Sequence, residues 1–217
     1  MRKTSLLLLT VLLSFSASYA QKMNWPLEFQ LHAGLQTNSA PNLNTLLKEN
    51  NLKAYPALGF AVGAQLGYNF KYFTLGTGIN SASTYNAENW NTKGIYLFVS
   101  TNSIHNDKFI FSPLISFGGQ FTKFDILKEN LTGTFDDFLT SKSNKTALEH
   151  TADVLDIAFV LKKKKGNLCF PLFRIGYRFG LDNTDWKVIG ATVSNLPQDK
   201  TGNFYAQVAF GIGRLKK

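Results

Sequence analysis

Apolar and polar side chains alternate along most of this chain with a period of two residues. In the clearest stretch Phe173, Ile175, Tyr177, Phe179 and Leu181 share one face, while arginine, glycine and aspartate residues share the other. Successive side chains of a β-strand point to opposite faces of the sheet, so this period predicts strands rather than helices. The same period recurs in seven more stretches: 27–36, 58–70, 73–80, 94–102, 109–122, 154–161 and 204–213. The sequence therefore predicts an all-β chain of eight strands.

The stretch 94–102 fits this pattern least well. Ile95, Leu97 and Val99 share one face, but Tyr96 and Phe98 occupy the other, so both faces are apolar. Periodicity leaves open which of the two faces looks outward.

Residues 1–20 have the marks of an export signal. They combine a basic start at 1–3, an apolar run over 6–15 and a small residue at Ala20. An apolar run of this length is too short to cross a bilayer as a helix, and the three features together are typical of a secretory signal peptide. We expect cleavage after Ala20, with 21–217 forming one domain.

Composition narrows the class of partner. Charged residues make up 17% of the chain, whereas a soluble domain carries about 25%. The formal net charge is +9, and a basic charge balance is often found in proteins that bind nucleic acid. An exported chain does not encounter nucleic acid, so we expect no nucleic-acid partner. Cys169 is the single cysteine, which excludes an internal disulfide. We expect its side chain to face lipid or a turn.

The connections between the predicted strands alternate in length. Short ones lie around Lys71 and Tyr72, at 103–108 and at 162–167, where the lysine run is interpreted as a polar hairpin tip. The others are long and polar: 37–56, 81–93, 123–153 and 183–203. An up-and-down barrel puts alternate connections at the same end, and outer-membrane barrels have short periplasmic turns and long external loops. This parity predicts that both termini are periplasmic.

Residue choice on the polar face indicates which face looks outward. A soluble barrel such as a lipocalin usually carries Lys, Glu and Thr outside, whereas this polar face is mostly Gly, Ala, Ser, Asn and Gln. Small side chains suit the filled interior of a narrow barrel, and the Phe, Leu, Ile and Val of the other face suit lipid. Because Trp and Tyr favour membrane interfaces, we expect two aromatic girdles: Trp25, Phe70, Tyr72, Phe73, Phe109 and Phe170 at the turn end, and Tyr55, Tyr85, Trp90, Phe121, Phe124, Trp186 and Phe204 at the loop end.

The predicted fold is an eight-stranded antiparallel up-and-down transmembrane β-barrel. With its signal, strand count, loop parity and terminal strand 204–213, the chain resembles the OmpA-like and PorT-like barrels of Gram-negative bacteria. The resemblance implies an outer-membrane location and folding by the barrel-assembly machinery, which reads a terminal aromatic residue. Phe210 and Ile212 fit the alternation, but 214–217 follow them, which departs from the usual terminal signal. A PorT-like barrel would imply an accessory part in a secretion or envelope complex.

Few charges fall on the inward face. The candidate residues of a lumenal charge network are Glu28, His32, Asp156, Arg174 and Arg178, with Asp182 at the rim. A hairpin turn near Lys165 or Gly166 puts Asp156 opposite or diagonal to both arginines, and Glu28 can reach across a narrow lumen. A guanidinium in a confined interior requires a carboxylate or several acceptors. We therefore expect a salt-bridge network that fills the barrel, with a gate or a small-solute path as the alternative.

Catalytic pairings are weak in this sequence. Some small outer-membrane barrels modify lipid A with a His and a Ser, and His150 lies near Ser141 and Ser143, as His105 lies near Ser103. Neither pair has an orienting acid at a spacing that supports a nucleophile and base. We expect no enzyme, with a lipid A deacylase as an alternative, and no metal or other cofactor.

Two of the long loops contain apolar residues. Asp125–Glu129 and Phe135–Leu139 mix apolar and acidic residues, and Leu43, Leu46, Leu47 and Leu52 are spaced near a helical period. Each loop is predicted either to form short helices over the barrel mouth or to remain a polar excursion. Our primary hypothesis is a monomer with a structural or interaction role, and its expected partners are the lipid bilayer, the assembly machinery and a protein of the envelope.

Overall fold

The structure is a computed structural model. It describes residues 26–49, 52, 54–84, 90–101, 104–106, 108–127, 145–189 and 196–215. The expected signal peptide 1–20 lies outside these residues, as do Trp25, Tyr85, Ser103, Ser141, Ser143 and Phe135–Leu139.

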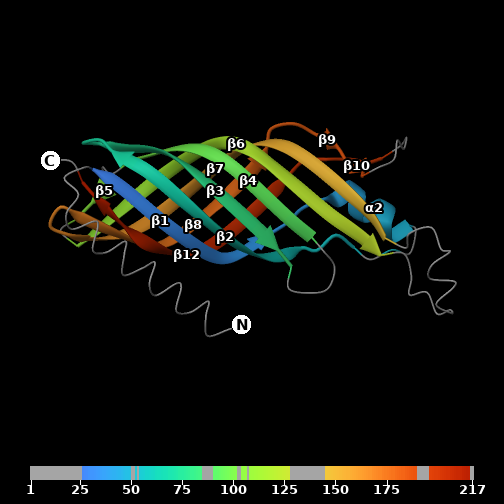
Figure 1. The fold of residues 1–217 in the computed structure, drawn as a ribbon, viewed down its shortest axis with the longest axis horizontal. Helices are drawn as coiled ribbons and strands as arrows, with labels where there is room; N and C mark the ends of the chain where they lie inside the picture. Colours follow the sequence, from blue (N-terminus) through green and yellow to red (C-terminus); the bar gives the residue numbers. More distant parts are fainter. Residues whose placement is uncertain are drawn as a thin grey trace.

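Eight long strands pair in a closed antiparallel ring (Figure 1). They are β1 Leu27–Thr37, β2 Leu58–Asn69, β3 Phe73–Ser83, β4 Trp90–Thr101, β6 Phe109–Leu127, β7 Lys145–Lys165, β8 Leu168–Gly180 and β12 Gly202–Arg214. Neighbours in sequence pair with each other, β6 pairs with β7, and β12 pairs with β1 to close the ring. This order confirms the predicted eight-stranded up-and-down barrel.

The remaining elements are short. They are α2 Pro41–Glu49, β5 Ile104–His105, β9 Thr184–Asp185, β10 Lys187–Val188 and β11 Gln198–Asp199. In Figure 1 β5 lies at one end of the barrel, and α2, β9 and β10 lie at the other. We call these the turn end and the loop end. Among the described residues, no helix is long and apolar enough to cross a bilayer.

Strand β4, whose facing the sequence left open, has a clear orientation. Ile95 and Leu97 are 64% and 67% exposed, whereas Tyr96 and Phe98 are 5% and 3% exposed. The two aromatic rings therefore lie inside the barrel. Their space comes from glycines on β3, since a Cβ at Gly78 would lie 2.5 Å from the Tyr96 ring.

The outward face forms what we call the apolar belt. Its exposed members include Leu35, Leu58, Phe60, Leu66, Leu75, Ile79, Ile95, Leu97, Ile115, Phe117, Ile157, Tyr177, Phe179, Val208 and Phe210. Outward-facing charged side chains of the long strands lie near the two edges of this belt, with Lys93 and Asp153 toward the loop end and Lys163 and Lys165 toward the turn end. At about 3.4 Å per residue and a tilt near 45°, the stretch from Phe109 to Phe121 rises about 30 Å along the barrel axis. That height is sufficient for the apolar band of about 25 Å that an outer-membrane barrel presents to lipid.

Two predicted long loops are shorter than expected, and a third settles an alternative. The loop predicted at 81–93 is reduced to 84–89, because β3 continues to Ser83 and β4 begins at Trp90. The predicted loop 123–153 is partly strand, because β6 continues to Leu127 and β7 begins at Lys145. The helix considered at Asp125–Glu129 is therefore wrong for 125–127, which extend the β6–β7 ladder. In the first loop the helical alternative is observed as α2, which buries Leu43 and Leu47.

Candidate functional site

An arginine cluster fills the middle of the lumen. Arg174 and Arg178 lie on β8, and the register pairs Arg178 directly with Asp156 of β7. Nη2 of Arg174 lies 3.0 Å from Oδ2 of Asp156, and Nη2 of Arg178 lies 3.5 Å from the same oxygen. One carboxylate thus contacts both guanidinium groups. All three side chains are buried, so each charge needs the others as partners in place of water.

Tyrosines and amides complete the coordination of the guanidinium groups. Arg174 donates from Nε to Oη of Tyr205 at 3.0 Å, and from Nη1 to Gln65 at 3.0 Å and to Tyr96 at 3.2 Å. Tyr205 in turn donates to Oδ1 of Asp156 at 2.8 Å. Arg178 donates to Gln120 at 3.2 Å. A fully hydrogen-bonded guanidinium is tolerated inside a barrel, because its donors have fixed acceptors.

Glycine explains why the two tyrosine rings fit beside these charges. A Cβ built at Gly176 would lie 2.5 Å from Oη of Tyr205, and Gly78 has the same relation to Tyr96. The small residues on the polar face thus leave the space that the inward aromatic rings occupy. This is the physical basis of the asymmetry that the sequence shows.

A second charged group lies toward the turn end. Nζ of Lys162 lies 2.8 Å from both Oε1 and Oε2 of Glu28. Gln30 also donates to Glu28, and Sγ of Cys169 lies 3.5 Å from Oε2. Glu28 and Lys162 are both almost fully buried, so this ion pair fills the lumen below the arginine cluster.

Three expectations about this region are corrected. Lys162 is a lumenal residue rather than part of a solvated hairpin tip, and Cys169 faces the lumen rather than lipid or a turn. Glu28 pairs with Lys162 instead of reaching the arginines. The alternation along β7 could have predicted the position of Lys162, because it falls on the same face as Asp156, Ala158 and Val160.

His32 and Asp182 have different settings. His32 is buried on β1, and its imidazole packs against Gly63 of β2. Asp182 follows β8 at the rim and is exposed. The structure therefore brings Asp156, Arg174 and Arg178 together, gives Glu28 another partner and leaves Asp182 at the surface.

A cluster of aromatic side chains, which we call the plug, closes the loop end. Tyr55 lies at its centre, with ring centroids 6.1 Å from Trp90, 5.4 Å from Phe124 and 5.6 Å from Trp186. Leu43 and Leu47 of α2 are buried in the same cluster. The prediction that Tyr55, Trp90, Phe124 and Trp186 belong to a lipid-facing girdle is therefore wrong. They point inward because each occupies an inward register position or lies on a loop folded over the mouth.

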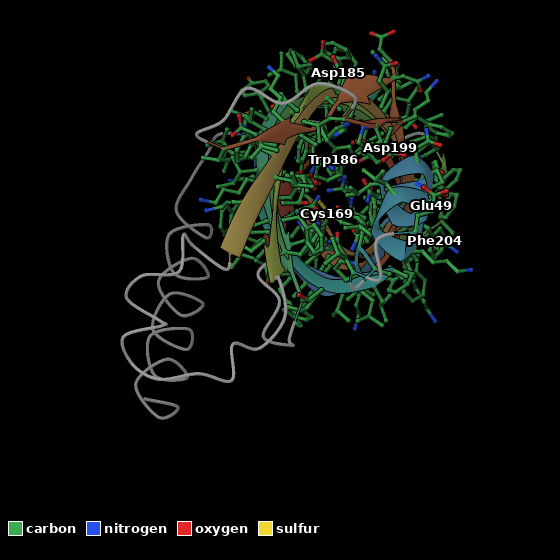
Figure 2. All side chains as sticks on the ribbon, turned by 90° about the vertical axis from the view of Figure 1, so that its right-hand side faces the viewer. Glu49, Cys169, Asp185, Trp186, Asp199 and Phe204 are labelled. Atoms are coloured by element: carbon green, nitrogen blue, oxygen red, sulfur yellow. The ribbon has the colours of Figure 1, made fainter. Side chains whose placement is uncertain are left out.

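Asp199 ties the first and fourth long loops together over the plug. Its Oδ1 accepts the backbone N–H of Asn42 at 2.9 Å, and its Oδ2 accepts that of Leu43 at 3.0 Å and Nε1 of Trp186 at 2.9 Å. The carboxylate thus caps the first turn of α2 from a distant segment. Figure 2 looks into the loop end, where Asp199 and Trp186 lie beside α2 and Cys169 lies within the ring of strands. Asp199 was not among the predicted site residues, because no local sequence pattern indicates a helix cap supplied from another loop.

Polar groups of the plug are engaged inside it. Trp90 donates to Tyr55 from its indole nitrogen, and burial raises the pKa of Tyr55 far above its ordinary value, so its hydroxyl is neutral. Nε2 of His150 lies 2.6 Å from the hydroxyl of Thr184 and 3.2 Å from the carbonyl oxygen of Asp199. The imidazole also packs on Trp186, with centroids 4.8 Å apart. These contacts give His150 a structural role within the plug. Within the described part of the chain, no His, Cys, Asp and Glu side chains gather as a metal site.

Comparisons with known proteins find no matching family and several solved structures of low sequence identity. No protein-family model matches the chain, and no curated protein matches it. Similar solved structures include Neisserial surface protein A, with 14% identity, TM-score 0.47, and coverage of 85% of this chain and 96% of that chain. They also include Ail, the attachment invasion locus protein of Yersinia pestis, with 10% identity, TM-score 0.44, and coverage of 88% and 99%. The outer membrane protein OprG from Pseudomonas aeruginosa has 10% identity, TM-score 0.44, and coverage of 89% and 98%.

The chain is an eight-stranded antiparallel β-barrel. That statement rests on its own strand pairing, and the predicted resemblance to small eight-stranded barrels is confirmed for the fold. The comparisons add no residue roles at these identities.

Proposed function

We propose that this chain is an integral outer-membrane barrel with a closed lumen and a structural or interaction role in the cell envelope. The observation that carries the proposal is the contrast between its two faces. The outward face is a mostly apolar belt, and the inward face holds the buried ions and amides. A protein dissolved in water would have the opposite distribution, because large contiguous apolar patches on a surface mark an interface with lipid or with another protein.

The contents of the lumen support a closed barrel over a solute path. Arg174 and Asp156 lie at mid-height, Glu28 and Lys162 lie toward the turn end, and the plug covers the loop end. An eight-stranded barrel has an interior just wide enough for side chains. A conducting path would require these bonded groups to separate, with the desolvation cost of buried charges.

Orientation follows from the lengths of the connections. The tight β2–β3 and β7–β8 turns share one end with Pro26 and Leu215, which hydrogen-bond to Asn69 and Asn167. The three longest connections, β1–β2, β6–β7 and β8–β12, lie at the other end. Outer-membrane barrels put short turns in the periplasm, so in this proposal both ends of the barrel chain are periplasmic. The loop end, with α2 and the plug, then faces the exterior and is the surface offered to an envelope partner.

Bilayer recordings test the proposal directly. The purified mature chain, in detergent, is expected to show a folded band that shifts on heating, and then to give no conductance steps after reconstitution into a planar bilayer. The Asp199→Ala variant is a matched probe, because it loosens the plug without touching the arginine cluster. Steady channel openings of the wild-type barrel would contradict a closed lumen, and a chain that stays soluble without detergent would contradict the membrane location.

The lipid A hydrolase alternative depends on His150 or His105. His150 is held by Thr184, Asp199 and Trp186, which favours a structural role. The expected result is an unchanged lipid A mass spectrum on expression of the wild type or of His150→Ala. A mass change that His150→Ala abolishes while the barrel stays folded would establish the enzyme instead.

A further inference from the structure

The turn end of the barrel carries a cluster of cations on its outward face. Lys163 and Lys165 of β7 are exposed and lie on the same face as the lipid-facing residues Ile157 and Phe159. Two residues apart on a strand, they are separated by about 7 Å. Among the long strands that the structure describes, β7 puts two lysines outward just below the apolar belt.

Apolar side chains flank these lysines on the neighbouring strands. Lys163 pairs with Phe109 of β6 on one side and with Phe170 of β8 on the other. Lys165 pairs with Leu168 of β8, and Leu168 in turn pairs with Arg214 of β12. Directly opposed side chains across strands lie about 5 Å apart. The cations and the apolar groups therefore form one surface, with the charges at its outer margin.

The local charge balance at this end is strongly positive. Glu28 supplies the only carboxylate among the described residues of the turn end, and it is buried in the lumen with Lys162. Lys163 and Lys165 face the other way, so the wall of the barrel separates them from that carboxylate. Lysine stems pack along apolar surface while their ammonium groups reach the headgroup region.

We propose that Lys163 and Lys165 form a binding site for the phosphate headgroup of an anionic glycerophospholipid. The acyl chains lie over Phe109, Phe170 and the belt above them, and the phosphate lies between the two ammonium groups, with Arg214 extending the cationic row. This inference rests on the proposed function, since it requires the belt to be in a bilayer. The turn end is then in the periplasmic leaflet, where glycerophospholipids supply such headgroups.

Charge and burial favour a lipid over a soluble anion. The two lysines lie on the sheet face beside exposed Phe109, which is 40% exposed, rather than in the β7–β8 turn at Gly166 and Asn167. A free anion would gain nothing from the flanking aromatic rings, whereas a lipid buries them with its chains. A membrane-proximal cation contributes to anionic lipid binding by about fivefold in affinity.

Native mass spectrometry of the detergent-solubilised mature barrel tests this site. The probes are phosphatidylglycerol and phosphatidylcholine, titrated separately against the wild type, Lys163→Gln/Lys165→Gln and Lys48→Gln/Lys200→Gln. The last variant removes the same charge from exposed positions at the loop end. The turn-end variant is expected to lose about 25-fold in affinity for phosphatidylglycerol, with phosphatidylcholine binding unchanged, and the loop-end variant is expected to behave as wild type. Lys163→Arg/Lys165→Arg should retain the binding.

Two outcomes would overturn the inference. One is equal loss of phosphatidylglycerol binding in the turn-end and loop-end variants, which would indicate net charge alone. The other is a wild-type barrel that binds both lipids equally. A heat-shifted gel band for every variant shows that the fold is intact, so either outcome contradicts the lipid site while leaving the membrane barrel standing. A chain that needs no detergent would instead contradict the proposed function.

Discussion

Asp156 is the residue on which the interior of the barrel depends most. Its carboxylate contacts Arg174 at 3.0 Å and Arg178 at 3.5 Å, and it accepts a hydrogen bond from Tyr205 at 2.8 Å. Hydrogen bonds to charged groups contribute about 1.5 to 3 kcal/mol each, and breaking a buried pair costs about 3 to 5 kcal/mol because the partner charge remains. Asparagine at 156 keeps one acceptor oxygen, so we expect Asp156→Asn to lower the free energy of unfolding by about 3 kcal/mol.

Urea unfolding of the barrel in lipid vesicles, followed by tryptophan fluorescence, measures this loss. A double-mutant cycle with Arg174→Gln separates the ion pair from general damage, and a coupling of about 1.5 kcal/mol is expected. Tyr205→Phe is the matched control, since it removes one hydroxyl and leaves the charges paired. An Asp156→Asn variant that loses no more stability than Tyr205→Phe, or a coupling of zero with Arg174, would show that this ion pair does not hold the interior together.

Three more predictions follow from particular contacts. Asp199→Ala should destabilise α2 by about 1 to 2 kcal/mol and expose Trp186 to acrylamide quenching, and unchanged quenching would show that the cap does not hold the plug. Gly176→Leu should prevent the heat-shifted folded band, because the new side chain would clash with the ring of Tyr205. Gly119→Ala should fold normally, since a Cβ at Gly119 meets nothing within 4 Å. Equal folding of both variants would contradict this packing of the lumen. Leu97→Lys should cost about 2 to 4 kcal/mol in vesicle-based unfolding, and a cost near zero would show that this position does not face lipid.

The fold could be predicted from the two-residue period, because every strand turns one face to the lumen and the other to the outside of the barrel. Strand number and the antiparallel pairing of neighbouring strands were predicted, and the structure confirms them. The alternation of connection lengths is confirmed only in part, because β3 continues to Ser83 and β4 begins at Trp90, which leaves a connection no longer than the one between Thr101 and Phe109. Strand β4 could not be oriented by this rule, since Tyr96 and Phe98 are as apolar as their neighbours. Their inward position depends on the space left by glycines of β3, which is a relation between strands and is absent from the local pattern.

The candidate site was predictable only where its contacts lie within one hairpin. Asp156 and Arg178 are cross-strand partners of β7 and β8, so hairpin geometry brings them together. Lys162 and Glu28 are far apart in sequence, and their pairing depends on closure of the ring. The plug is still harder to predict from sequence, because its aromatic residues have the composition expected of a membrane girdle. Their inward position depends on loops that fold over the mouth of the barrel.

Solvent and lipid accessibility along β4 shows directly whether the apolar face of the barrel meets lipid or water. Single cysteines at 95 to 99, in a Cys169→Ala background, can carry spin labels in the barrel reconstituted in vesicles. We expect positions 95, 97 and 99 to be accessible to oxygen in the bilayer and shielded from a water-soluble nickel reagent. Positions 96 and 98 should be shielded from both. High nickel accessibility at 95, 97 and 99 would show that the apolar face meets water, and would contradict a membrane barrel with a closed lumen.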